Sequence, residues 1–233
     1  MREFTIEQGK PYGEIYSRGF LRDGQNRILV GANGMPRITA GRTVMVGNFN
    51  PDWMGGIFTS LRYKKVSLTA LIDHRQGGSI ISMTNSMLYA NGMTEGTLIG
   101  REGGVIFGKD IFSNEVAVSE VDGHINDVPI SPETLWNTIG GRNTPVGEAF
   151  VESATNTRLR EITLGYSLPI KISGANASNL QIMLVGRNLF FIQRASDSID
   201  PDFMVGTSPD SEGFQSFTPP TTRSYGISLR LSF

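Results

Sequence analysis

Cysteine is absent from the 233 residues, and histidine occurs only at His74 and His124. The chain therefore has no disulfide framework, no thiolate metal site and no cysteine nucleophile. The two histidines stand in unrelated sequence contexts, and neither a G-x-S-x-G turn nor a phosphate-binding loop with Lys-Ser/Thr occurs. We therefore predict no metal centre, no cofactor and no enzymatic activity.

An excess of charge of one sign and a long apolar run are also lacking. Lysine and arginine number 21 against 22 aspartate and glutamate, so the formal net charge is −1 and nothing indicates a nucleic-acid partner. No run approaches the roughly 18 apolar residues of a membrane-spanning helix, and MREFTIEQGK lacks the regions of a signal peptide. We expect either a cytosolic protein or the C-terminal part of a longer exported chain.

Glycine, in contrast, is abundant with 28 residues, which favours a turn-rich, all-β protein. The most regular pattern is the stretch RSYGISLRLSF at residues 223–233. A strand of this length, at about 3.3 Å per residue and tilted by about 45°, spans roughly 26 Å, close to the apolar band of an outer-membrane β-barrel. Its apolar side chains share one pleated face: Tyr225, Ile227, Leu229, Leu231 and Phe233.

Arg230 distinguishes the two possible registers of this stretch in a barrel. If the apolar face meets lipid, Arg230 points into a wet lumen, whereas the opposite register places it in hydrocarbon at about 2–4 kcal/mol. The first register is therefore expected. A half-buried strand of a soluble β-sandwich shows the same alternation, so this stretch alone leaves both protein classes open.

Other segments predict further strands. Alternating residues at 57–63 and 66–73 indicate a hairpin with its turn at Lys64-Lys65, and two more strands are predicted at 158–168 and 179–191. The outer half of the last one loses its clean alternation, which favours a bulge or a strand end there.

The remaining stretches, at about 75–150 and 193–222, are predicted to be long loops, with a short helix near 79–90. Connections this long suit the external side of a barrel better than a compact soluble domain. Aromatic residues in them are candidate substrate or partner contacts: Trp136, Phe203, Phe214 and Phe217.

Acidic residues in the second long loop could supply oxygen ligands to calcium. Asp197, Asp200 and Asp202 lack the spacing of a D-x-D-x-D-G loop, however. Solvated carboxylates are therefore the favoured interpretation of this cluster.

Six further segments follow one another along the chain: GKPYGEIY at 9–16, GNFNPDW at 47–53, LIDHRQGGSIISMTN at 71–85, RLREITLGYSLP at 158–169, LVGRNLF at 184–190 and PPTTRSYGISLRLSF at 219–233. Together and in this order, they resemble the SusC/RagA-type TonB-dependent transporters of the outer membrane. The resemblance implies that residues 1–233 are the C-terminal antiparallel strands of a large transmembrane β-barrel of about 22 strands, with long extracellular loops. It further implies that the plug domain and the signal peptide are absent from this chain.

The same resemblance implies a function and partners. The chain would be a fragment of an outer-membrane importer of glycan or peptide, contributing barrel wall and loops that contact substrate and lid. Its partners would be a SusD-like surface lipoprotein, the TonB complex through the missing N-terminal part, and the lipid bilayer. The alternation ending at Phe233 resembles the signal read by the outer-membrane assembly machinery. The alternative is a soluble β-sandwich that binds carbohydrate, in which the apolar faces of 158–168 and 223–233 would pack together.

Overall fold

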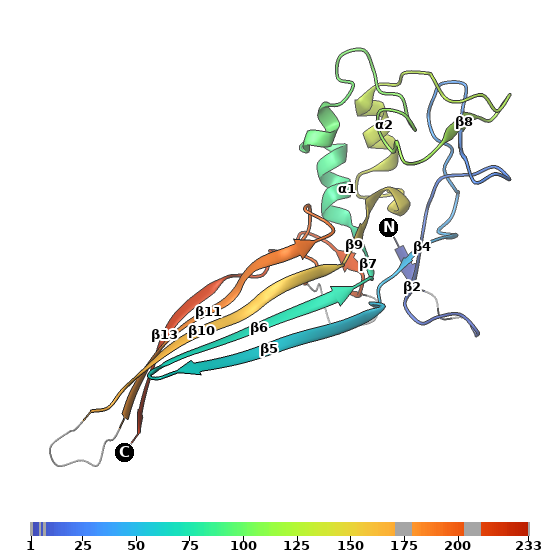
Figure 1. Cartoon of the computed structure of the whole chain (residues 1–233). Coiled ribbons are helices and arrows are strands. Elements are labelled where there is room, and N and C mark those ends of the chain that lie inside the picture. Colours follow the sequence, from blue (N-terminus) through green and yellow to red (C-terminus); the bar gives the residue numbers. More distant parts are fainter. Residues whose placement is uncertain (1, 5, 7, 171–178, 203–210, 233) are drawn as a thin grey trace. The chain divides into compact units, whose positions relative to one another are not determined.

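The computed structural model describes residues 2–4, 6, 8–170, 179–202 and 211–232. The chain divides into two compact units. The first comprises Met1–Asn50, Gly78–Glu152 and Met204–Thr218, and the second comprises Pro51–Gly77, Ser153–Phe203 and Pro219–Phe233. Each unit is assembled from separate stretches of sequence (Figure 1).

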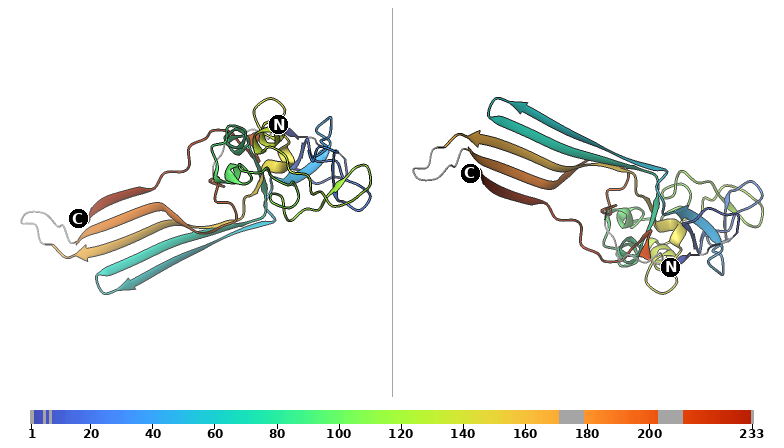
Figure 2. Two further views of the ribbon diagram at one scale, coloured as in Figure 1. Left: turned by 90° about the horizontal axis from the view of Figure 1, so that it is seen from above. Right: turned by 90° about the horizontal axis from the view of Figure 1, so that it is seen from below.

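The second unit is a five-stranded antiparallel sheet in which the long strands lie side by side (Figure 2). Its spatial order is β13-β11-β10-β6-β5, and β5 and β13 form its edges, so the sheet is open. The strands are β5 (Trp53–Tyr63), β6 (Val66–Gln76), β10 (Asn156–Leu168), β11 (Asn179–Arg194) and β13 (Ser224–Ser232). The prediction of long antiparallel strands is confirmed.

The tight connection between β5 and β6 lies where the sequence predicts it. Tyr63 pairs with Val66, and Lys64 between them has a φ of 52°. A left-handed conformation at such a position is typical of a two-residue hairpin turn, whose twist matches that of the flanking strands. Asn188, with a φ of 51°, marks the irregular outer half of β11, where the register with β10 shifts. Of the two expected outcomes, a bulge or a strand end, the register shift fits the bulge, because β11 continues to Arg194.

Short elements build the first unit. Its strands are β1 (Arg2–Phe4), β2 (Glu14–Ser17), β3 (Ile28–Val30), β4 (Val44–Asn48), β7 (Ser79–Ser82), β8 (Ala117–Ser119), β9 (Val151–Ser153) and β12 (Phe214–Gln215). They form sheets of order β1-β2-β4 and β12-β7-β9 and the parallel pair β3-β8. Its helices are α1 (Met83–Ala90), α2 (Pro132–Ile139), and the 3₁₀ turns η1 (Glu95–Leu98) and η2 (Gly147–Phe150).

The predicted helix near 79–90 is present, but it begins at Met83 because β7 occupies the first four positions. The hydroxyl of Ser82 accepts a hydrogen bond from the backbone N–H of Asn85, which caps the helix start. Helix α2 begins in the same way, with Ser131 as N-cap and Pro132 in its first turn, and it ends at Gly140. No helix among the described residues is long and apolar enough to cross a membrane.

Two apolar clusters stabilise the first unit. The larger surrounds Phe107 and includes Leu135 and Ile139 of α2, all fully buried, with Phe20 and Phe107 in an edge-to-face contact at 5.2 Å. The smaller joins Ile15, Phe49 and Ile81. Burial of this kind contributes about 1.5–3 kcal/mol per large side chain, so the segment predicted as a long loop is packed around a core of its own.

Candidate functional site

Apolar side chains lie in register across all five strands of the sheet. One row of paired residues comprises Leu61, Leu68, Leu164, Leu184 and Ile227, and the next comprises Tyr63, Val66, Tyr166, Ile182 and Leu229. Neither row contains a charged residue. Leu184 is 51% exposed and Ile227 73% exposed, so this face carries an accessible apolar surface on the described residues.

The opposite face of the same sheet is small and polar. One of its rows comprises Arg62, Ser67, Gly165, Met183 and Ser228, and the next comprises Ser60, Thr69, Thr163, Val185 and Gly226. Arg230 lies on this face, opposite Gln181. Because β10 and β13 both pair with β11 in one sheet, their apolar faces do not pack against each other as the sandwich alternative requires.

An ionic network lies on the polar face where β10 begins. Arg158 is 3% exposed, and its Nη1 lies 2.6 Å from Oδ2 of Asp202, which also accepts a hydrogen bond from Arg160 Nη1 at 2.6 Å. Arg160 Nε reaches Asp73 on β6 at 2.5 Å. The Arg158 guanidinium also stacks over the ring of Phe191, 4.5 Å from its centroid.

Asp200 completes this network. Its Oδ2 accepts hydrogen bonds from the backbone N–H of Thr221 at 2.9 Å and from the Thr221 hydroxyl at 2.6 Å. Burial raises the pKa of the Asp200 carboxyl, but these hydrogen bonds and the charge of Arg158 outweigh it, so the pKa lies below its usual value. Asp200 and Asp202 are thus carboxylates paired within the buried network, whereas Asp197 is 91% exposed and pairs with Arg194 at the surface. Within the described ranges, no group of three or more metal-ligating side chains is present.

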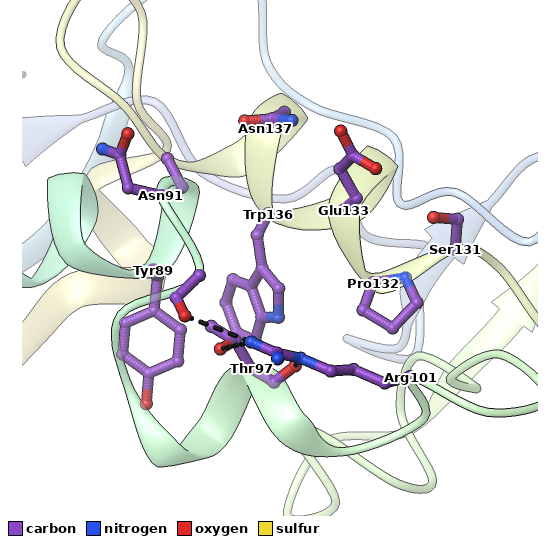
Figure 3. Close-up of a pocket in the computed structure, with 11 residues that line it drawn as sticks. Tyr89, Asn91, Thr97, Arg101, Ser131, Pro132, Glu133, Trp136 and Asn137 are labelled. Carbon is purple, nitrogen blue, oxygen red and sulfur yellow. Dashed lines mark hydrogen bonds between the residues drawn. The ribbon is translucent and has the colours of Figure 1, made fainter.

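A cavity of about 470 Å³ lies between α1, η1 and α2 in the first unit (Figure 3). Polar side chains surround it at several points, and two aromatic rings form one wall. Tyr89 and Trp136 pack against each other with ring centroids 4.4 Å apart. The residues that line it are Tyr89, Ala90, Asn91, Gly92, Thr97, Arg101, Ser131, Pro132, Glu133, Trp136 and Asn137.

Known proteins resemble this chain in sequence and in fold, although no family model matches it. TonB-dependent receptor P26 of Formosa agariphila is 24% identical over 233 residues, covering 96% of this chain and 21% of the relative. The RagAB peptide importer in its open-open state matches with a TM-score of 0.54 and 18% identity over 98% of this chain and 24% of that chain. Its closed-closed state matches with a TM-score of 0.52 and 18% identity over 95% and 23%.

This chain resembles the SusC/RagA-like TonB-dependent transporters. The structural likeness shows the fold, and the curated relative carries the name of a TonB-dependent receptor. The chain spans about a fifth of the relative's length and about a quarter of the RagAB chain's. The names of these proteins describe a receptor and a peptide importer, not an enzyme.

The predicted loop aromatics do not come together. Trp136 lines the cavity, whereas Phe214 packs against the cluster of Ile15, Phe49 and Ile81. Phe217 is exposed, and its backbone N–H donates to the hydroxyl of Thr84 at 2.7 Å. Phe203 lies outside the described residues.

The predicted assembly motif lies on the edge strand β13. Its four described members, Tyr225, Ile227, Leu229 and Leu231, occupy the apolar face. Phe233 lies outside the described residues. The sequence analysis did not select Arg101, Tyr89 or Arg158. The sequence does contain a signal for Arg158: Arg158 and Arg160 are charged residues at the start of a series of alternate positions that is otherwise apolar. No local pattern marks Arg101.

Proposed function

We propose that this chain forms part of the membrane-spanning wall of an outer-membrane, TonB-dependent importer. The two-faced sheet is the observation that supports this most strongly. In a soluble protein an apolar face of this extent is covered by another layer, and in a barrel lipid covers it. The nine residues of β13 span about 30 Å at 3.3 Å each, or roughly 21 Å when tilted by about 45°, similar to the apolar band of about 25 Å.

The imported molecule and the partners follow by similarity. We propose that the substrate is a bulky nutrient, either a glycan or a peptide, and that a SusD-like surface lipoprotein covers the importer. The RagAB structures, named as a peptide importer, support the peptide alternative. Energy would come from the TonB complex through a part of the protein beyond this chain. The location would be the cell outer membrane.

Roles for particular segments are part of the same proposal. The long segments at about 75–150 and 193–222 would lie on the outer side and meet substrate and lid. Among the candidate loop aromatics, Phe217 is exposed to a ligand or partner, and Trp136 lines the cavity with its ring largely buried. The alternating residues of β13 would be recognised by the assembly machinery. A soluble carbohydrate-binding sandwich is disfavoured, because the apolar face is exposed.

A pair of adjacent substitutions tests the wall function. Ile227→Arg puts a charge on the apolar face, at a cost of about 2–4 kcal/mol near the bilayer midplane, whereas Ser228→Arg puts the same charge on the face that already carries Arg230. The level of each variant in the outer-membrane fraction is measured by immunoblotting. We expect Ile227→Arg to reduce that level several-fold and Ser228→Arg to leave it near the native level.

Two results would count against the proposal. Equal outer-membrane levels of the two variants would show that the faces are equivalent. Recovery of the native protein in the soluble fraction without detergent would contradict a membrane wall altogether and favour the sandwich.

A further inference from the structure

One cationic and one anionic side chain line the cavity between α1, η1 and α2, and they do not pair with each other. Arg101 and Glu133 both line it, and neither forms an ion pair with any described residue. Their charges are therefore available to a ligand. Pockets that bind small molecules combine a concave, partly apolar wall with a few such polar groups, and a volume of about 470 Å³ lies in the usual range.

Arg101 is held in place by its own surroundings. Its Nε donates to the Thr97 carbonyl at 3.1 Å, and its Nη2 donates to the Gly92 carbonyl at 3.1 Å and the Thr97 hydroxyl at 3.2 Å. These acceptors are neutral, so the positive charge is not neutralised, and Nη1 makes no hydrogen bond to the described part of the chain. Gly92 has a φ of 67°, a left-handed conformation that suits glycine, at the turn that follows α1.

The aromatic wall is closed to stacking. Trp136 is only 6% exposed, because its ring packs against Tyr89 at 4.4 Å and lies 6.3 Å from Phe112. A sugar ring needs an open aromatic face, and Trp136 does not offer one. Its indole N–H makes no hydrogen bond to the described residues and can donate only to a ligand or to water. The wall therefore supplies shape and a donor rather than a stacking platform.

We propose that this cavity binds a short peptide by its free C-terminal carboxylate, with Arg101 as the carboxylate-binding residue and Glu133 facing the peptide's amino group. A guanidinium whose Nε and Nη2 are fixed and whose Nη1 is free presents a preorganised charged donor. The side-chain amides of Asn91 and Asn137 at the rim suit peptide bonds. This inference rests on the proposed import function in one respect: it takes the ligand of the cavity to be the imported molecule.

Calorimetric titration of the purified, detergent-solubilised protein tests the carboxylate. The probes are trialanine, trialanine amide, N-acetyl trialanine and trigalacturonate. We expect trialanine to bind and the amide to bind about tenfold more weakly or worse, because the charge-assisted hydrogen bond is lost. Tighter binding of trigalacturonate than of trialanine would overturn the peptide assignment, and equal binding of trialanine and its amide would overturn the role of Arg101.

Variants locate the effect in the cavity. Arg101→Gln should abolish the preference for acid over amide, and Glu133→Gln should weaken trialanine while leaving N-acetyl trialanine unchanged. Glu133 makes no hydrogen bond to the described residues, so its replacement should not disturb the fold. Arg142→Gln is the matched control, an exposed arginine of the same unit that lies outside the cavity. An unchanged acid preference in Arg101→Gln would contradict the proposal.

The outer-membrane level of each variant separates this inference from the proposed wall function. We expect normal levels for Arg101→Gln and Glu133→Gln, because neither residue lies on the sheet. A protein that inserts normally but shows no acid preference would refute the cavity alone. A protein that fails to insert even in its native form would refute the wall function alone.

Discussion

Asp202 is the residue whose loss should most weaken the attachment of the segment that precedes β13. Its carboxylate accepts from Arg158 Nη1 and Arg160 Nη1, both at 2.6 Å, and from Arg160 Nη2 at 3.0 Å. Because Arg158 is buried, Asp202→Ala leaves a buried guanidinium without its nearest counter-ion, a change that typically costs about 3–5 kcal/mol. Asp200 remains 3.8 Å from Arg158 Nη1, so we expect the lower end, about 3 kcal/mol.

Hydrogen exchange followed by mass spectrometry measures this loss directly. The backbone N–H of Thr221 is bonded to Asp200 within the network, so its exchange reports local opening. A cost of about 3 kcal/mol predicts exchange roughly 10²-fold faster in Asp202→Ala than in the native protein. The matched control is Asp197→Ala, which removes the same charge from an exposed pair with Arg194 and should change exchange by less than about fivefold.

A double variant identifies the cause. If the uncompensated charge is responsible, the Thr221 amide should exchange more slowly in the double variant Asp202→Ala/Arg158→Met than in Asp202→Ala alone. The double variant has no unpaired guanidinium at position 158, and Arg160 keeps its ion pair with Asp73. Equal exchange at Thr221 in Asp202→Ala and Asp197→Ala would refute the reasoning, because the buried pair would then behave like an exposed one.

Three further predictions concern acid sensitivity, packing and assembly. The lowered pKa of Asp200 stabilises the folded protein at pH values above the carboxyl's ordinary pKa of 3.8, and this stabilisation is lost as the pH falls through the folded-state pKa. Acid should therefore speed proteolysis around Thr221, and Asp200→Asn should reduce this dependence on pH. Leu135→Ala should destabilise the first unit by about 2–5 kcal/mol, seen as a lower melting temperature, whereas the exposed Thr138→Ala should not. Deleting Phe233 should lower the outer-membrane level of the protein, and an unchanged level would contradict the assembly role of the β13 motif.

The long strands could be predicted from sequence because the residue pattern within each strand reflects the surroundings of its two faces. Ile227 and Ser228 alternate between two surroundings, and an apolar-polar alternation of period two survives in the sequence whatever the neighbouring strand is. The Lys64-Lys65 turn is equally local, since two residues between paired strands leave little choice of geometry. The alternation does not show what covers the apolar face, so it fits a sandwich as well. The pairing of β10 and β13 with β11 in one sheet is what separates the two alternatives.

The first unit could not be predicted in the same way, because its contacts join distant stretches of sequence. Strands β3 and β8 have three residues each and pair with each other in parallel, although about 90 positions separate them in the sequence. The cavity forms where α1, η1 and α2 pack, and no pattern near Arg101 marks it. Helix α2 is the exception: Ser131, Pro132 and Glu133 form a start signal, and Gly140 forms a stop signal that sequence analysis could have used.

The bulge in β10 shows how charge can reveal geometry that alternation hides. Counting back by twos from Ile162 places Arg160 and Arg158 on the apolar face, where each would cost about 2–4 kcal/mol in lipid. In the structure the register shifts between Leu159 and Glu161. As a result, Arg158 lies opposite Asp73 of the neighbouring strand β6, on the polar face. An arginine on the apolar parity of an otherwise regular membrane strand therefore indicates a bulge between the arginine and the apolar run. The ionic network depends on that single extra residue, because without it Arg158 would point away from Asp202.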